Sequence, residues 1–211
     1  MKKRRSPSGG ERDRAHTEQQ ILAAVGRLLE KSGFDDVGVN AVAREAGVDK
    51  VLIYRYFGKM PDLLRAFAER GEHWPSDAEL LGEDPPAEPA ALAAHLLVRF
   101  GRAIRERPQT QAIMRHELSE RNPLTDALAD AREEQALRLL SRLGEPGVDA
   151  SAVGALLGAG LTYLALRANT ADQYNGVNLR SAEGWQALEH AVVQIVSAVF
   201  PADAARPKRR G

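Results

Sequence analysis

The sequence contains no cysteine, and only 5% of its 211 residues are aromatic. Without cysteine the chain forms neither a disulfide nor a catalytic thiolate, which fits a reducing compartment. No stretch alternates apolar and polar residues for long enough to predict a β-strand. The hydrophobic share of 44% is ordinary for a globular protein, and the frequent Ala, Leu, Arg and Glu favour helix.

Segments that would direct the chain into a membrane are also missing. Residues 1–5 are basic, but no apolar run follows them, so we expect no signal peptide. The longest apolar stretch, residues 152–166, is short for a bilayer span and ends at Arg167. We therefore expect a soluble, cytoplasmic protein with no membrane partner.

The motifs of common catalytic and cofactor sites are absent. There is no His-Glu-x-x-His, no Gly-x-Ser-x-Gly and no phosphate-binding loop. No histidine has a glutamate three residues before it, which a di-metal carboxylate bundle requires. Gly158-x-Gly160 lacks the third glycine and the preceding strand of a dinucleotide site. We predict that the chain is not an enzyme and that it has no metal site and no cofactor.

The formal net charge is zero, but the charges are separated along the chain. Residues 1–59 hold 12 Lys or Arg against 8 Asp or Glu, whereas residues 60–205 hold 13 against 21. The last six residues add four bases and no acid. A basic end joined to an acidic body suggests that one end alone meets a polyanion.

Helical periodicity organises nearly all of the chain between a basic N-terminal arm and a basic tail. Apolar residues at helical spacing predict a first helix over about residues 13–31. Gly and Asp signals predict short helices over 40–46 and from Asp49 to about residue 57, and Pro61 opens a fourth helix reaching about Trp74. Further helices are expected at about 90–106, 109–120, 123–143, 150–169 and 182–200, with a proline-rich loop over 81–89.

Residues 38–64 carry the strongest functional pattern. Gly47 separates two short helices and permits a sharp turn at positive φ, while small residues such as Ala43 and Ala46 let the helices approach closely. This is the geometry of a helix-turn-helix, whose second helix enters the major groove of DNA. The outward side of that helix holds Lys50, Val51, Tyr54 and Arg55, which suit phosphate and base contacts. A structural helical hairpin with a solvated basic side explains the same spacing.

The sequence motif distinguishes between a DNA-binding helix-turn-helix and a structural helical hairpin. Residues 43–50 read AREAGVDK and residues 54–57 read YRYF, followed by Lys59 and two leucines. This run follows one amphipathic helix near the N-terminus and resembles the signature of the TetR family of transcriptional regulators, over about residues 15–67. The resemblance implies a helical homodimer that binds a palindromic double-stranded DNA operator and a small-molecule effector.

The resemblance also implies roles for individual residues. Lys50 stands where the family contacts DNA at the start of the recognition helix, and Tyr54 stands at its phosphate-contacting tyrosine. Tyr56 stands at a DNA-facing aromatic or histidine, while Lys59 and Arg44 stand at positions that grip the DNA backbone. The full set of candidate DNA-binding residues is Arg44, Lys50, Val51, Leu52, Tyr54, Arg55, Tyr56 and Lys59.

Three positions depart from the family pattern. Gly38 replaces the usual Thr or Ser N-cap, which removes one capping bond at a cost of about 0.5 kcal/mol or less. Val51 and Leu52 replace the common Gly-Thr pair, so the phosphate-bonding hydroxyl is missing. These apolar side chains could touch thymine methyl groups, or Leu52 could simply pack on the protein.

The two last helices predict a dimer interface. Residues 153–166 are apolar nearly all round and contain small residues, and the last helix has apolar residues at 3-4-3-4 spacing. The family resemblance implies that these helices form a four-helix bundle across a two-fold axis, although both could pack within one subunit. The candidate interface residues are Gly154, Gly158, Trp185, Leu188, Val192, Ile195 and Val199.

A ligand pocket is implied by the resemblance alone. Its candidate lining residues are polar or aromatic groups on otherwise apolar helices, and each of them also has a plain explanation as a core or surface residue. They are His95, Arg99, Phe100, Met114, His116, Glu117, Tyr163 and Asn169.

The prediction is thus an all-α protein with an N-terminal three-helix helix-turn-helix domain joined to a helical-bundle domain for ligand binding and dimerisation. The domain boundaries are a disordered basic arm over 1–12, the DNA-binding domain over 13–60, the bundle over 61–200 and a disordered basic tail over 201–211. The predicted function is transcriptional repression that a small molecule relieves. The alternative is an architectural or co-regulatory dimer that binds DNA without a ligand. The effector, the operator and the regulated genes are not encoded in any motif, nor is the choice between repression and activation.

Overall fold

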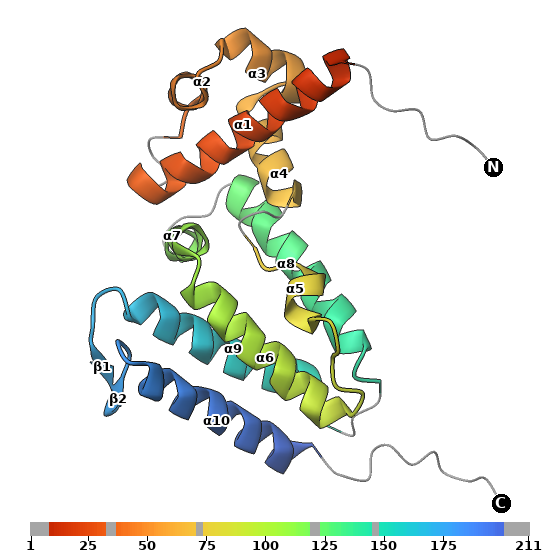
Figure 1. Cartoon of the computed structure of the whole chain (residues 1–211), viewed down its shortest axis with the longest axis vertical. Coiled ribbons are helices and arrows are strands. Elements are labelled where there is room, and N and C mark those ends of the chain that lie inside the picture. Colours follow the sequence, from red (N-terminus) through yellow and green to blue (C-terminus); the bar gives the residue numbers. More distant parts are fainter. Residues whose placement is uncertain (1–8, 33–36, 71–73, 119–122, 145–147, 201–211) are drawn as a thin grey trace, which may run out of the picture. The chain divides into compact units, whose positions relative to one another are not determined.

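The computed structural model describes residues 9–32, 37–70, 74–118, 123–144 and 148–200. Nearly all of this part of the chain is α-helical, with one short antiparallel hairpin (Figure 1). The chain divides into two compact units, the first built from residues 1–73 and 112–129 and the second from residues 74–111 and 130–211. The predicted all-α class is confirmed.

The first unit contains four helices from the N-terminal part of the chain: α1 (Gly9–Ser32), α2 (Val39–Ala46), α3 (Lys50–Phe57) and α4 (Met60–Arg70). Its core forms around one side of α1, where Ile21, Val25 and Leu29 are buried to 1% exposure or less. Ile53 of α3 and Leu63 of α4 complete this core, equally buried. Burying these aliphatic side chains is the main force that fixes α2 and α3 on α1.

The second unit is a helical bundle with a hairpin between its last two long helices. Its elements are α5 (Asp77–Leu81), α6 (Pro89–Arg105), α9 (Ala150–Arg167), β1 (Gln173–Tyr174), β2 (Val177–Asn178) and α10 (Ala182–Val199). Helix α6 packs against both α9 and α10. Its own start is well defined, because Pro89 occupies the first turn and the Glu88 carboxylate accepts hydrogen bonds from two backbone N–H groups.

Two helices supply residues to both units. Helix α7 (Pro108–Glu117) contributes Ile113, and α8 (Pro123–Ser141) contributes Leu128, to the core of the first unit. Leu139, near the other end of α8, belongs to the core of the second unit. Each core is therefore assembled from segments far apart in the sequence.

Most expected helices are present, with ends near those predicted. Three features were not expected: the start of α1 at Gly9, the short helix α5, and the hairpin. Helix α1 begins at Gly9, inside the predicted basic arm, whose first eight residues lie outside the described part, as does the tail over 201–211. The hairpin turns at Asn175 and Gly176, whose φ angles of 47° and 83° fit a two-residue turn. The hairpin strands are two residues each, too short for an alternating pattern to predict.

Candidate DNA interface and ligand pocket

The turn between α2 and α3 has the geometry of a helix-turn-helix. Gly47 ends α2 in the left-handed region at φ 68°, and the backbone N–H of Val48 returns to the carbonyl of Ala43 at 3.0 Å. Asp49 then caps α3, since its carboxylate accepts a hydrogen bond from the backbone N–H of Val51 at 2.8 Å. Gly38 caps α2 without a side-chain hydrogen bond, as its lack of a side chain predicts.

Helix α2 is tied to α1 by charges. The Arg27 guanidinium donates to the Glu45 carboxylate at 2.7 Å and to its backbone carbonyl at 3.2 Å, and the Lys31 ammonium lies 3.4 Å from the same carboxylate. The hydrogen bond from Arg27 lowers the pKa of Glu45, so this carboxylate stays ionised. The pair fixes the orientation of α2 on α1, although exposed pairs of this kind contribute little to stability.

The exposed side of α3 carries the cations and apolar groups that the spacing predicted to face outward. Lys50, Val51, Tyr54 and Arg55 are all exposed, with fractions of 62% for Val51 and 51% for Tyr54. Helical geometry places these four side chains within about 140° of one another around the axis. An exposed tyrosine and valine beside two cations form a surface suited to the edges and phosphates of DNA.

The remaining two candidates on α3 lie on the other side of the helix. Leu52 is half-buried, and Tyr56 is half-buried against the core of the first unit. The guanidinium of Arg14, on α1, lies 5.2 Å from the centre of the Tyr56 ring, and that of Arg55 lies 5.9 Å from it. Sequence reasoning missed Arg14, because a contact between α1 and α3 leaves no trace in local spacing.

Arg44 and Lys59 are exposed at the edges of the same motif. Arg44 lies on α2, and Lys59 directly precedes α4. The backbone N–H of Lys59 donates to the Asp62 carboxylate at 3.1 Å, which fixes the start of α4 and leaves the Lys59 ammonium in solvent. Both cations are therefore exposed at the surface of the motif, and neither takes part in the ion pairs described above for α1 and α2.

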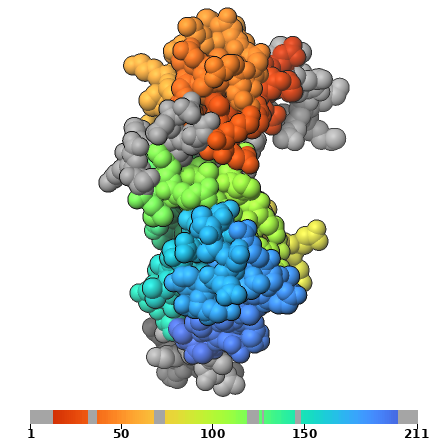
Figure 2. Space-filling model, turned by 90° about the vertical axis from the view of Figure 1, so that its left-hand side faces the viewer, coloured from red at the N-terminus to blue at the C-terminus, as the bar shows by residue number. Residues whose placement is uncertain are grey.

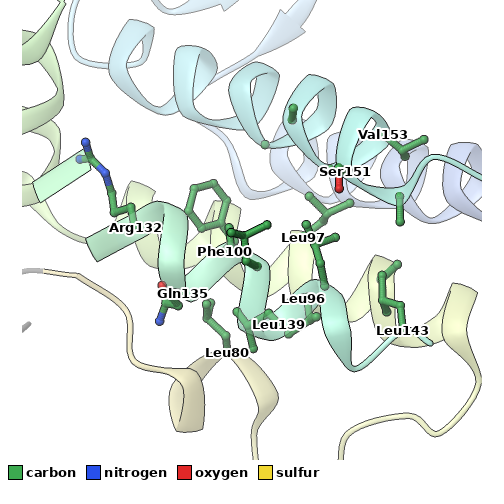
Figure 3. A pocket seen from close by; sticks show the side chains of 18 of the residues that line it. Leu80, Leu96, Leu97, Phe100, Arg132, Gln135, Leu139, Leu143, Ser151 and Val153 are labelled. Carbon is green, nitrogen blue, oxygen red and sulfur yellow. The ribbon is translucent and has the colours of Figure 1, made fainter. Parts of the chain in front are cut away.

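The second unit contains a cavity of about 390 Å³ among its helices (Figure 3). Its wall is almost entirely apolar and comes from α5, α6, α8 and α9, together with Trp74 and Phe200. Leu96, Leu97 and Phe100 of α6 face Leu139 and other leucines of α8 across it. The volume lies in the range that buries a small organic molecule.

Trp74 is held at the cavity by a dense set of contacts. Its indole N–H donates to the Gln135 carboxamide oxygen at 2.6 Å, and its ring centre lies 5.7 Å from that of Phe100. The Arg132 guanidinium lies 5.1 Å from the centre of the same ring. Gln135 in turn donates to the Pro75 carbonyl at 2.9 Å and to the Asp77 carboxylate at 2.8 Å. This network fixes one end of the cavity.

Of the eight residues predicted to line a ligand pocket, the structure places Phe100 on the cavity wall. His95 and Arg99 instead bond to the backbone carbonyls of Leu81 and Glu79. Asn169 donates to Gln111, and Tyr163 is half exposed against Tyr174 of the hairpin. Met114, His116 and Glu117 lie in the part of α7 that belongs to the first unit.

The predicted dimer residues fall into four different environments. Gly154 and Gly158 lie on the cavity wall, where small side chains leave room. Trp185 and Val192 are buried within the second unit, with exposures of 6% and 5%. Leu188 is half-buried, whereas Ile195 and Val199 are 44% and 41% exposed.

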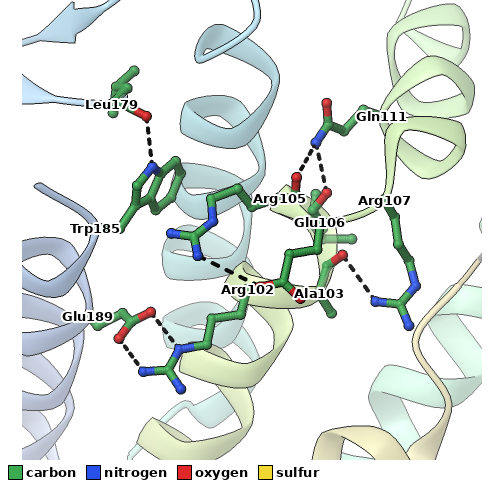
Figure 4. Close-up of polar contacts among 10 residues, drawn as sticks. Arg102, Ala103, Arg105, Glu106, Arg107, Gln111, Leu179, Trp185 and Glu189 are labelled. Carbon is green, nitrogen blue, oxygen red and sulfur yellow. Dashed lines mark hydrogen bonds and ion pairs between the residues drawn. The ribbon is translucent and has the colours of Figure 1, made fainter. Parts of the chain in front are cut away.

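Polar contacts hold the inner side of α10 against other residues of the same chain (Figure 4). The Trp185 indole donates to the Leu179 carbonyl at 2.9 Å, and the Arg105 guanidinium lies 4.9 Å from its ring centre. Arg102 of α6 makes a two-pronged ion pair with Glu189, which lowers the pKa of that carboxyl. A methyl group on Gly184 would overlap the Asn178 carbonyl, so this glycine permits the hairpin to lie against α10.

Helix α9 keeps most of its surface exposed in the single chain. Leu161 and Ala165 are its buried residues, while Leu156 is 76% exposed. Among the described helices, α9 alone has the length and apolar composition to cross a membrane, and a single helix of this kind is weak evidence of a membrane span. Figure 2 shows the blue part of the surface, formed by the end of α9, the hairpin and α10, uncovered on that side. No group of three or more potential metal ligands occurs in the described residues.

A capped helix-turn-helix with an exposed basic side defines the class of DNA-binding proteins that read the major groove with a helix. Residues 21–67 match the model of the bacterial regulatory proteins of the tetR family. None of the curated proteins compared with the chain matches it significantly in sequence.

Solved structures resemble the chain over nearly its whole length. A TetR family transcription regulator from Marinobacter aquaeolei VT8 has a TM-score of 0.66 at 18% identity, over 88% of this chain and 97% of that one. A TetR-like transcriptional regulator from Rhodococcus sp. RHA1 has a TM-score of 0.62 at 18% identity, over 92% and 99%. The fatty acid degradation regulator FadR from Bacillus halodurans has a TM-score of 0.61 at 18% identity, over 92% and 96%.

Residues 21–67 are thus similar to the helix-turn-helix domain of the tetR family of bacterial regulatory proteins, and the chain has the fold of solved TetR-family regulators. The helix-turn-helix geometry and this match together indicate a DNA-binding regulatory protein.

Proposed function

We propose that the chain is a homodimeric repressor that binds a palindromic operator and is released from it by a small molecule. The observation that carries the proposal is the pairing of an exposed Lys50, Val51, Tyr54 and Arg55 surface in one unit with an apolar cavity of about 390 Å³ in the other. The cavity also favours this function over the ligand-independent alternative, because a regulator that binds no ligand does not require a cavity. As in other regulators of this kind, the cytoplasm is the compartment in which DNA and effector meet.

On the DNA side, phosphate contacts and base contacts are assigned separately. We assign Tyr54, Lys59 and Arg44 to phosphates, because they are exposed at the edges of the motif. Lys50 and Arg55 are assigned to the groove on the exposed side of α3, with Val51 against a thymine methyl. Leu52 and Tyr56 are half-buried, so we give them at most a supporting role in holding α3.

The dimer is assigned to the exposed apolar sides of α9 and α10. On α9 these residues include Leu156 and Tyr163, which are 76% and 50% exposed, and on α10 they include Ile195 and Val199. Exposed apolar surface of this extent is typical of a protein interface. Two-fold pairing would set two recognition helices about 34–36 Å apart, one turn of DNA.

Release requires that the effector bind more tightly to the dimer conformation that does not fit the operator. The effector and the operator must then weaken each other's binding by the same factor, equivalent to about 1–3 kcal/mol. Helix α4 directly follows the helix-turn-helix and ends at Arg70, and Trp74 of the cavity wall follows four residues later. This short covalent connection makes α4 one element through which we expect the coupling to act, together with α7 and α8, within which the chain also crosses between the units.

The test begins with an operator selected from random duplexes by the purified protein. Calorimetric titration of an identified effector is then repeated with and without that operator. The proposal predicts that the operator weakens effector binding about 5-fold to 150-fold. Equal effector affinity in both titrations would remove ligand release and leave a DNA-binding dimer that acts without this ligand.

A further inference from the structure

The positive charge of the N-terminal part of the chain is concentrated in a short segment before α1. Residues 1–10 contain no acid and four bases, here called the arm bases: Lys2, Lys3, Arg4 and Arg5. Residues 11–59 hold the other 8 Lys or Arg against 8 Asp or Glu, so the helix-turn-helix and the helix before it have no net charge. Cations that replace the counterions of phosphates supply much of a protein's affinity for DNA. The arm bases therefore supply the whole net positive charge with which residues 1–59 attract DNA.

The arm bases bring no benefit to the helix that follows them. The dipole of a helix places partial positive charge at its N-terminus, where anions are favourable and cations are not. Like charges on four successive residues also repel one another. A role in stabilising α1 thus does not explain the arm bases, whereas contact with a polyanion outside the chain does.

The start of α1 lies beside the helix that carries the exposed basic side. Among the described side chains of α1, Ile21 is the first buried one, so the helix extends beyond its core toward its N-terminus. The Arg14 guanidinium of α1 and that of the exposed Arg55 of α3 lie over the same Tyr56 ring, at 5.2 Å and 5.9 Å from its centre. Figure 1 shows the start of α1 next to α3. The chain that precedes α1 therefore begins next to the DNA-facing side of α3.

The spacing between the arm bases and α1 selects a groove of DNA. Arg5 and Lys2 precede Gly9 by four and seven residues, which can span at most about 14 Å and 25 Å. The major groove that would receive α3 is about 12 Å wide, so this length passes the bordering phosphates and reaches the next minor groove. In homeodomains, whose three helices also contain a helix-turn-helix, a basic arm before the first helix enters that groove.

We propose that the arm bases occupy the minor groove that adjoins the α3 site, one arm for each half of the operator, and that they favour A·T pairs there. The narrow minor groove of A·T runs has an enhanced negative potential that attracts lysine and arginine, whereas the amino group of guanine projects into the groove at G·C pairs. The operator is then read in two grooves. The inference rests on the DNA binding of the proposed function, and it requires neither an effector nor the cavity.

Methylation by dimethyl sulfate distinguishes the two grooves in one sample. The reagent methylates N7 of guanine, which lies in the major groove, and N3 of adenine, which lies in the minor groove. The probe is the operator selected with the full-length protein, synthesised with A·T runs beside each half-site. The wild type is expected to protect guanine N7 within the half-sites and adenine N3 in an adjoining run.

Two variants of equal charge change assign that protection. The arm variant carries Lys2→Gln, Lys3→Gln, Arg4→Gln and Arg5→Gln. It should lose protection of adenine N3 and keep that of guanine N7, which also shows that it is folded and bound. Its affinity should fall about 10-fold or more at about 0.1 M salt, because contacts with phosphates are lost with the charges. The control removes four bases at the other end of the chain and should behave as the wild type: Arg206→Gln, Lys208→Gln, Arg209→Gln and Arg210→Gln.

Replacing the flanking runs tests the preference for A·T pairs. Inosine·cytosine pairs lack the guanine amino group in the minor groove but present the same major-groove atoms as G·C pairs. The wild type is expected to bind operators with A·T or inosine·cytosine flanks about 5-fold or more tightly than one with G·C flanks. The arm variant should bind all three alike.

The proposal is overturned if the wild type protects no adenine N3, if the arm variant retains that protection, or if the C-terminal control loses it as well. Equal affinity of the wild type for the three flanks would leave the arm bases with phosphates alone and reject the minor-groove assignment. Tighter operator binding by the arm variant would show that these bases pair with the acidic remainder of the chain. Failure of the wild type to bind any duplex would reject the proposed DNA binding itself, which the other outcomes leave intact.

Discussion

The cores of the two units differ, because a cavity lies among the core residues of the second unit. In the helix-turn-helix unit, Ile21, Val25 and Leu63 have no exposed surface at all. In the second unit Val196 is equally buried, but Leu96 and Leu139 of the same core line the cavity. A close-packed core holds one arrangement of α2 and α3, whereas a core with internal space can accept a ligand. The second core therefore has room for a small molecule.

The largest expected effect on stability comes from truncating one leucine in each core, and the two variants together test this comparison. Leu29→Ala, in the first unit, should lower the free energy of unfolding by about 3–5 kcal/mol, because it opens a new cavity in a filled core. Leu139→Ala should cost about 2 kcal/mol or less, since part of its side chain already faces empty space. Urea unfolding followed by circular dichroism measures both.

The pair of truncations can also contradict the comparison. Equal losses of stability would mean that the wall of the cavity is as tightly supported as the first core. Unfolding in two separate transitions would require each variant to be assigned to its own unit, with hydrogen exchange of α1 and α8 as the readout. The conservative variant Leu139→Met, which nearly conserves volume, is expected to stay close to wild type.

A smaller effect is expected where the second unit meets a partner. Ile195→Glu should weaken dimer formation more than 100-fold, about 3 kcal/mol, because the carboxylate would be buried without a partner. Val193→Glu is the control, since Val193 is 42% exposed against 44% for Ile195 and lies about 200° away around α10. Sedimentation velocity separates monomer from dimer, and a stable dimer of Ile195→Glu would place the interface elsewhere.

The choice of Ile195 illustrates what the sequence could and could not predict. The 3-4-3-4 spacing on α10 correctly marks an apolar seam, but it does not say what covers each position. The structure buries Trp185 and Val192 inside the chain and leaves Ile195 and Val199 exposed. The spacing of apolar residues defines one side of the helix. Which of those residues pack inside the chain, and which remain exposed for a partner, depends on how α6 packs against α10.

Local signals were sufficient wherever a structure depends on neighbouring residues. Gly47 and Asp49 predict the turn and the cap because their hydrogen bonds reach only a few residues. The cavity depends on α6, α8 and α9 together, so no spacing predicted Arg132 or Gln135 as its lining. Asn175-Gly176 was a turn signal that pointed to the hairpin, but its two-residue strands gave no periodicity to support it.

A still smaller effect tests the DNA-reading side of the comparison. Lys59→Ala should weaken binding to selected and random duplexes alike by about 1 kcal/mol and lower the salt slope by about one unit, because a phosphate contact is independent of sequence. Lys31→Ala makes the same charge change at the far end of α1, where Lys31 pairs with Glu45. Anisotropy titrations at several salt concentrations measure both, and loss of selected binding alone would make Lys59 a base reader.

The smallest effect concerns the start of α2, where Gly38 supplies no side-chain cap. Gly38 precedes α2 at φ −116° and ψ 162°, an extended conformation that any residue adopts, and no atom lies within 4 Å of the position of an added Cβ. A serine there would accept a hydrogen bond from a backbone N–H of the first turn, so Gly38→Ser should raise the free energy of unfolding by a few tenths of a kcal/mol, up to about 0.5. Gly38→Ala isolates the hydroxyl, because it adds the same Cβ without the acceptor. Thermal unfolding should therefore rank serine above alanine. If alanine stabilised the protein as much as serine, the gain would come from the reduced freedom of the unfolded chain, and the missing cap would have no measurable cost.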